Sequence, residues 1–201
     1  MLTVAIQAGG NSTRMGRDKA LLPFLGKPLI ARVLERLAPL ADEVLVITNR
    51  PQEYQFLGVP LYMDIVAGRG ALGGLYTCLS VAHNALVAVV ACDMPFVNRH
   101  LLAAMVDCLL SQDLDAVIPL TAQGMEPLHA VYHRETCLPA VREALEGGAW
   151  KLIAWLPAVR VLTLQPEEIA PFDPRGTAFW NLNTPEEFHQ AEQLAREWEK
   201  E

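Results

Sequence analysis

The residues best suited to chemistry lie near the start of the chain, in the segment AGGNSTRMGRDK at residues 8–19. Its two adjacent glycines permit a tight turn and let backbone N–H groups approach an anion closely. Three cations that could neutralise phosphate charge follow within nine residues: Arg14, Arg17 and Lys19. The spacing matches neither the GxxxxGK[ST] P-loop nor the GxGxxG dinucleotide motif. The segment predicts a phosphate-binding loop, with an ordinary polar strand-to-helix turn as the alternative.

Two aspartates extend this candidate site. Asp93 ends the long apolar run ALVAVVACD (85–93), and a carboxylate at a strand end is a hard oxygen ligand suited to Mg²⁺. Its alternative role is to cap a helix that begins near Asn98. Asp64 precedes a glycine-rich stretch, where a lone acid is often a turn residue.

The cysteines and histidines predict no further metal site. The four cysteines contain no CxxC pair and stand in apolar surroundings, which favours reduced thiols and a cytoplasmic protein. His129 and His133 are four residues apart, which on a strand separates them by about 13 Å. We therefore expect structural histidines and no zinc. No apolar run reaches the roughly 18 residues of a membrane span, so we expect no membrane association.

Length and charge limit the possible partners. The chain has 201 residues, of which 52% are hydrophobic and 19% charged, so we expect one domain, residues 1–201, with a large core. The net charge of −7 argues against binding to nucleic acid. Residues 1–32 nevertheless hold five basic residues against one acid, a local charge of +4 within this acidic protein. A small anion is the partner that this basic corner predicts.

Apolar runs and amphipathic segments alternate along the chain, and these elements must position the candidate residues. We predict strands at 2–8, 43–49, 59–64, 85–93, 115–120, 127–133 and 159–164, and helices at 28–40, 72–82, 98–110, 135–146 and from 184 onward. The alternation predicts an α/β fold with a Rossmann-like, doubly wound, mostly parallel sheet. Residues 120–135 place two strands without an intervening helix, which predicts one antiparallel strand. Ligands of such sheets bind beyond the carboxyl ends of the strands.

Several stretches resemble the nucleotidyltransferases that act on the molybdenum cofactor, specifically the guanylyltransferases. The opening AGGxSxRMGxDK pattern and the CDMPF segment (92–96) are the most specific of them. The other matching stretches are DIVAGRGALGGL (64–75), EPLHAVY (126–132) and NLNTPEEF (181–188). The resemblance spans nearly the whole chain, and it implies the sheet of nucleotide-diphospho-sugar transferases in a single nucleotidyltransferase domain.

The resemblance also implies roles for individual residues. It places nucleotide-binding residues at Gln7, Ala8, Gly9, Gly10, Lys19, Asn49, Asp64 and Asp93. It implies that Arg14, Lys19 and Asp93 are catalytic, that Asp93 holds Mg²⁺, and that Asn181 and Asn183 lie near the pterin substrate. The chain departs from the family at Gln7, where Leu is common, at GALGG in place of GPLAG, and at Ile47, where some members have Asn.

The implied reaction transfers GMP from GTP to the terminal phosphate of molybdopterin, or of its metal-loaded form, with release of pyrophosphate. Gln7 and Ile47 touch the implied base pocket, so a cytidylyltransferase acting on the same pterin stays an alternative, as does a sugar-1-phosphate nucleotidyltransferase. An alternative of another class is a nucleotide-binding module without turnover. Further expected partners are other enzymes of cofactor biosynthesis or the enzymes that accept the finished cofactor, and we expect a monomer or a weak oligomer.

Overall fold

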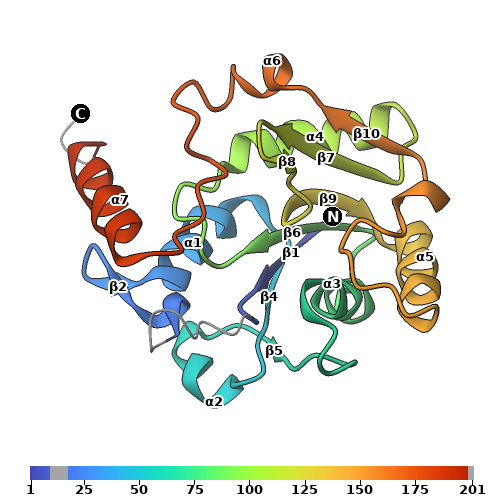
Figure 1. Cartoon of the computed structure of the whole chain (residues 1–201), viewed down its shortest axis with the longest axis horizontal. Coiled ribbons are helices and arrows are strands. Elements are labelled where there is room, and N and C mark those ends of the chain that lie inside the picture. The colour runs from blue at the N-terminus through green and yellow to red at the C-terminus, as the bar shows by residue number, and fades with distance from the viewer. Residues whose placement is uncertain (10–17, 199–201) are drawn as a thin grey trace.

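A mixed sheet of eight strands forms the centre of the computed structural model, which describes residues 1–9 and 18–198. Its strands are β1 (Leu2–Gln7), β4 (Glu43–Ile47), β5 (Leu61–Tyr62), β6 (Leu86–Ala91), β7 (Ala116–Thr121), β8 (Gly124–Met125), β9 (His129–His133) and β10 (Val161–Leu164). They are arranged in the order β10-β7-β9-β6-β1-β4-β5, with β8 joined to β7 (Figure 1).

The strand directions confirm the predicted mostly parallel α/β fold. β1 runs parallel to both β4 and β6, whereas β9 is antiparallel to its two neighbours, β6 and β7. β9 is thus the antiparallel strand that the missing helix between residues 120 and 135 predicted. The short strand β8 is a second antiparallel strand, which the sequence did not indicate because its two residues cannot show an alternating pattern.

The centre of the sheet is the core of the molecule. Every residue of β1 and of β6 is buried, since helices cover both faces there. The register pairs Leu2 with Leu86 and Gln7 with Ala91, so the two strands end side by side.

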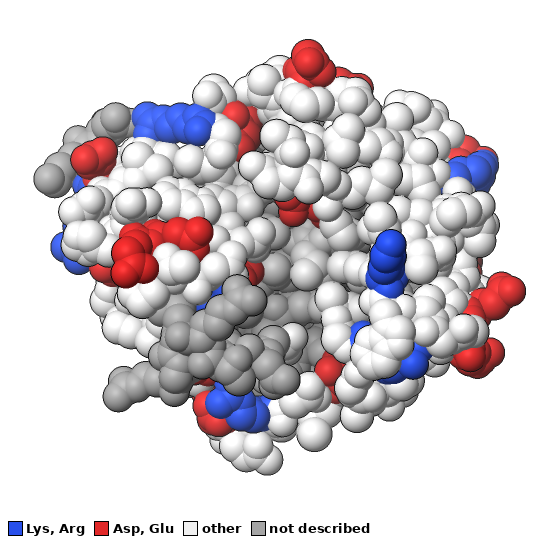
Figure 2. All heavy atoms as spheres, in the orientation of Figure 1, with Lys and Arg blue, Asp and Glu red and all other residues white. Residues whose placement is uncertain are grey.

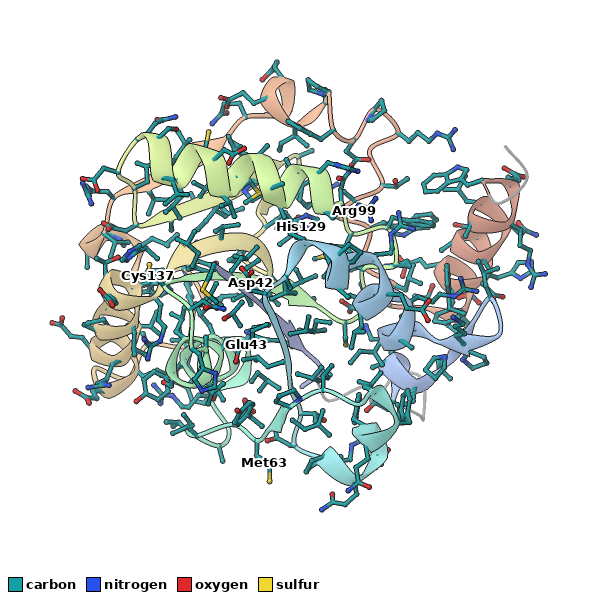
Figure 3. The ribbon with its side chains drawn as sticks, turned by 180° about the vertical axis from the view of Figure 1, so that it is seen from behind. Asp42, Glu43, Met63, Arg99, His129 and Cys137 are labelled. Atoms are coloured by element: carbon teal, nitrogen blue, oxygen red, sulfur yellow. The ribbon has the colours of Figure 1, made fainter. Side chains whose placement is uncertain are left out.

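Helices lie on both faces of the sheet. The longer ones are α1 (Leu29–Leu37), α3 (Gly70–Val81), α4 (Arg99–Ser111), α5 (Arg134–Glu146) and α7 (Pro185–Trp198), and two single-turn helices are α2 (Pro51–Tyr54) and α6 (Pro166–Ile169). α3 and α5 pack together, and the Arg69 guanidinium donates to the carbonyls of Leu145 and Ala149 at the end of α5. α1 and α4 lie toward the viewer when the molecule is seen from behind (Figure 3). Among the helices of the described residues, none has the length and apolarity needed to cross a membrane.

The glycine-rich stretch is helical almost where the sequence predicted. The predicted helix of residues 72–82 is α3, which begins two residues earlier, at Gly70, and contains Gly73 and Gly74 as predicted. A Cβ atom on Gly73 would lie 2.9 Å from the Arg69 Cβ atom, and one on Gly74 would lie 2.4 Å from the Gln7 Oε1 atom. Glycine is needed at these two positions because the side chains of Gln7 and Arg69 pack directly against the helix there.

The C-terminal helix packs against the segment around Phe24. Strands β2 (Pro23–Phe24) and β3 (Lys27–Pro28) form a separate antiparallel pair, and α7 lies beside it (Figure 1). The Phe24 ring makes edge contacts with Phe96 at 6.3 Å and with Phe188 at 5.5 Å between ring centroids. A second hydrophobic cluster therefore joins the two ends of the chain.

Candidate functional site

The candidate site lies where β1, β4 and β6 end. The three parallel strands finish at Gln7, Ile47 and Ala91, and a cavity of about 400 Å³ opens beyond the ends of β1 and β6. The face of the molecule seen in Figure 2 is hollowed near its centre. The cavity is lined by Gln7, Ala8, Gly9, Asp18, Lys19, Ala20, Ala71, Ala91, Cys92, Asp93, Leu128, Asn181 and Asn183.

Lys19 brings three parts of the chain together. Its Nζ atom donates to the Asp93 Oδ2 atom at 2.8 Å, to the Leu182 carbonyl at 2.9 Å and to the Asn183 Oδ1 atom at 3.0 Å. The side chains of Lys19 and Asp93 are 16% and 18% exposed, so the ion pair faces the cavity but is largely shielded from bulk water. Such shielding strengthens the interaction of the ammonium group with an added phosphate.

Asp93 follows β6 by two residues, as its place after the apolar run predicted. Its carbonyl accepts a hydrogen bond from the Leu182 amide at 3.0 Å, which fixes the C-terminal segment beside the strand end. The helix near Asn98 is capped by Asn98 itself, whose Oδ1 atom accepts from the His100 and Leu101 amides. The alternative role of Asp93 as a helix cap is therefore not needed.

Asn49 and Asp64 form a pair beside Gly9. The Asn49 Nδ2 atom donates to the Asp64 Oδ2 atom at 2.8 Å, and the Asp64 amide donates to the Asn49 Oδ1 atom at 3.1 Å. The same Asp64 oxygen lies 3.9 Å from where a Gly9 Cβ atom would stand. A side chain at position 9 would point toward this pair, so glycine leaves the space between the strand end and Asp64 open.

The backbone at the end of β1 is partly used by the sheet. The Ala8 amide donates to the Ile47 carbonyl at 2.8 Å, and the Gln7 carbonyl accepts from the Cys92 amide at 3.0 Å. Of the predicted backbone contacts with a nucleotide, the Ala8 amide and the Gln7 carbonyl thus already have partners. Gly10 and Arg14, also predicted site residues, lie outside the described residues.

Asp18, which the sequence did not indicate as a site residue, anchors the backbone next to Lys19 as the N-cap of the short helix Lys19–Leu21. Asp18 accepts hydrogen bonds from the Ala20 amide at 3.1 Å, from the Tyr54 hydroxyl at 2.5 Å and from the Arg50 guanidinium. Burial and the Asp18 carboxylate raise the pKa of Tyr54, which keeps its hydroxyl protonated as a donor. In the sequence, the one hint of this network is the position of Asp18, directly before Lys19 in the motif.

The two asparagines of the C-terminal motif both line the cavity. Asn183 contacts Lys19, and its amide donates to the Glu187 carboxylate at 2.6 Å. Asn181 also lines a second cavity, of about 840 Å³, between β7, α6 and the C-terminal segment. Of the two residues predicted to lie near the pterin, Asn181 thus lines both cavities and Asn183 lines only the first.

Comparisons with known proteins agree with this architecture. Residues 4–161 match the family model described as the MobA-like NTP transferase domain. The chain is 34% identical over 96% of its length to the probable molybdenum cofactor guanylyltransferase of Peptoclostridium acidaminophilum, of which 89% is covered. It is 36% identical to the protein of the same name from Carboxydothermus hydrogenoformans, with 94% of each chain covered.

A solved structure has the same fold over almost the full length. The crystal structure of molybdopterin-guanine dinucleotide biosynthesis protein A from Archaeoglobus fulgidus superimposes with a TM-score of 0.83 at 27% identity. The match covers 97% of this chain and 99% of that protein.

Proposed function

The chain belongs to the MobA-like NTP transferase domain family, and from this premise we propose that it transfers GMP from GTP to the terminal phosphate of molybdopterin or of its metal-loaded form. The products are the guanine dinucleotide form of the cofactor and pyrophosphate. The observation that carries the proposal is the Lys19 ammonium group, held by Asp93 and Asn183 in a cavity at the strand ends. The names of the two guanylyltransferase relatives support GTP as the donor.

Charge neutralisation and alignment are the chemistry that this reaction needs. An ionised oxygen of the pterin phosphate attacks the α-phosphorus of GTP, and the bond from that phosphorus to the bridging oxygen breaks. Because both reactants are anions, the barrier falls mainly when they are held in line and their charge is balanced. Lys19 supplies a positive charge at the point where the phosphates of both substrates would meet. No protein nucleophile is required.

Asp93 fits the magnesium ion that the proposal includes. Mg²⁺ usually binds one or two carboxylates and completes its coordination with water and substrate phosphates. Within residues 1–9 and 18–198, Lys19 occupies the Asp93 Oδ2 atom and no hydrogen bond is formed to Oδ1, which leaves this oxygen for a cation. The described residues contain no group of three or more His, Cys, Asp or Glu suited to an all-protein metal cage. When bound, the ion would neutralise charge on the triphosphate.

We assign the nucleotide to the Gly9 side of the cavity, next to the pair of Asn49 and Asp64, which lie beside Gly9 but are not among the residues that line the cavity. Gly9 leaves room for a close approach to the backbone, and the paired Asn49 and Asp64 side chains present polar atoms next to it. Gly10 and Arg14, from the same sequence motif as Gly9, are proposed to complete the triphosphate site. Asn181 and Asn183 are proposed to contact the phosphate end of the pterin substrate.

Pyrophosphate release in the presence of molybdopterin and Mg²⁺ tests the function, with GTP, CTP and ATP compared as donors. We expect release with GTP. We also expect Lys19→Ala and Asp93→Asn to lower turnover by about 10²-fold or more, as for groups that stabilise charge in the transition state. Lys27→Ala is the matched control, because Lys27 forms an exposed ion pair with Glu35. Preference for CTP, or near-normal turnover in both folded site variants, would contradict the proposal.

A further inference from the structure

The second cavity, of about 840 Å³, is built for an uncharged or hydrogen-bond-donating group. Its volume is within the usual range for small-molecule sites. Phe179 and Trp180 contribute aromatic surface, and no Lys or Arg is among the described residues that line it. A phosphate would find no balancing cation in this cavity. The part of a ligand that binds here is therefore a planar or apolar group, with its anionic part elsewhere.

Glu126 is the acid of this cavity that accepts no main-chain amide among the described residues. Its Oε1 atom accepts from the Thr121 hydroxyl at 3.1 Å, and its own amide donates to the Pro119 carbonyl at 2.9 Å, so the residue is held in place. The side chain is half-buried, and burial raises the pKa of its carboxyl group. In the described part of the chain, no hydrogen bond is made to the Glu126 Oε2 atom.

The other two acids of the cavity already serve the backbone. Both oxygens of Asp173 accept from main-chain amides, those of Thr177 at 3.0 Å and Ala178 at 2.8 Å. The Glu187 Oε2 atom accepts from the main-chain amides of Asn183 at 2.6 Å and Thr184 at 2.9 Å, which holds this carboxylate at the start of α7. Partner groups of this kind stabilise the charged carboxylates locally and leave Glu126 to interact with a ligand.

The two cavities share one lining residue, Asn181. The acceptor of the proposed reaction has matching chemistry, with a phosphate at one end and a pterin ring at the other. Its phosphate belongs at the Lys19 end, where the positive charge is. The ring then extends past Asn181 into the cavity without cations. A pterin carries a ring N–H and an amino group side by side, two parallel donors of the kind that a carboxylate can accept together.

We propose that Glu126 is a specificity-determining residue for the acceptor, and that its carboxylate binds the amino-pyrimidinone edge of the pterin ring in the cavity between β7, α6 and Phe179. The proposal rests on the proposed function for its choice of ligand. The guanine base has the same donor edge, so the experiment must distinguish the pterin from the base of GTP.

Binding of simple heterocycles to the full chain tests the proposal without turnover. The probes are 6-hydroxymethylpterin and the matching lumazine, in which an oxygen replaces the amino group, and calorimetry gives the two dissociation constants. We expect the wild-type protein to bind the pterin about tenfold or more tightly, as for a charged hydrogen bond lost in the analogue. In Glu126→Gln we expect this preference to fall to about twofold or less. Glu146→Gln, an exposed change at the end of α5, should keep it.

Competition and turnover separate the possible failures. Saturating GTP should leave pterin binding unchanged, and Glu126→Gln should raise the KM for the acceptor with little change in the KM for GTP. Loss of pterin binding when GTP is added would assign the cavity to the guanine base and overturn the proposal. So would an unchanged pterin preference in Glu126→Gln. A wild-type protein that binds pterin through Glu126 but releases no pyrophosphate would refute the proposed function while supporting this assignment.

Discussion

At the scale of single residues, His129 links burial to the pH dependence of stability. It lies within β9 with no exposed surface, and its ring is 4.8 Å from that of Phe179 between centroids. Burial lowers the pKa of His129 to about 4, so the imidazole is neutral in the folded protein at pH 7. In the unfolded chain the same group titrates near pH 6.5. The unfolded state therefore binds more protons between these two pKa values, and the folded state loses stability as the pH falls through this range.

We expect this residue to reduce the free energy of unfolding by about 2 kcal/mol between pH 7 and pH 5. Urea denaturation of the wild-type protein and of His129→Leu at both pH values measures the effect. Because leucine does not titrate, the variant should lose about 2 kcal/mol less than the wild type over this interval. His100→Gln, an exposed change at the start of α4, should behave like the wild type. Equal pH dependence in His129→Leu and wild type would refute the assignment.

The sequence identified some site residues better than others for a physical reason. Lys19 and Asp93 stand in motifs at predicted strand ends, where their residue types indicate their chemistry. The roles of Asp18 and Glu126 could not be predicted from the sequence in this way. Asp18 depends on Arg50 and Tyr54, more than 30 positions away along the chain, and Glu126 matters because a cavity forms around it. Contacts of this kind arise only when the sheet brings distant segments together.

At the scale of elements, the contact between α3 and β1 makes a sharp prediction. A Cβ atom on Gly74 would lie 2.4 Å from the Gln7 Oε1 atom, within the core. Gly74→Ala should lower the free energy of unfolding by about 1–3 kcal/mol, because the clash outweighs the roughly 1 kcal/mol that alanine gains in a helix. Gln7→Ala removes the clashing atoms, so adding Gly74→Ala to it should cost at least about 1 kcal/mol less than in the wild type.

Urea denaturation of the two single variants and the double variant gives this coupling energy. Ser80→Ala provides the comparison on the same helix, because the Ser80 hydroxyl bonds to the Tyr76 carbonyl rather than to β1. The change that Ser80→Ala makes in the free energy of unfolding should add to that of Gln7→Ala without a coupling energy. Additive behaviour of Gly74→Ala and Gln7→Ala would show that α3 does not pack on β1 as described.

Helices and strands were predictable where they are long and buried, because their apolar residues then form a long pattern in the sequence. The continuous apolar runs that became β1 and β6, and the amphipathic periods of α1 and α4, were read correctly to within one or two residues at most ends. The predicted strand at 59–64 is reduced to Leu61–Tyr62, and the pair β2–β3 was not predicted. Such short elements are defined by pairing with their neighbours, which no local pattern reports. The predicted start of α3 is two residues late, because glycines usually indicate a loop.

At the scale of the whole molecule, the two ends of the chain build the site together. Lys19 comes from the N-terminal part and donates to Leu182 and Asn183 in the C-terminal part. The segments that flank these contacts are joined a second time, where α7 places Phe188 against Phe24. Lys19, one of the five basic residues in residues 1–32, thus has its charge set against acceptor groups from the other end of the chain.

This arrangement predicts that Phe188 supports both stability and catalysis, although it does not line the cavity of Lys19. Phe188 is 9% exposed, and Phe188→Ala should lower the free energy of unfolding by about 3 kcal/mol through the void left against Phe24. At a temperature where the variant stays folded, turnover should also fall severalfold, because α7 begins two residues after Asn183 and a small displacement there misplaces Lys19. Trp150→Ala is the control, because Trp150 is 68% exposed and, within the described residues, its ring contacts the Arg69 guanidinium. This variant should lower the free energy of unfolding by about 1 kcal/mol or less and leave turnover unchanged. Normal turnover in folded Phe188→Ala would mean that Lys19 is held by its own hydrogen bonds, independently of how the C-terminal helix is packed.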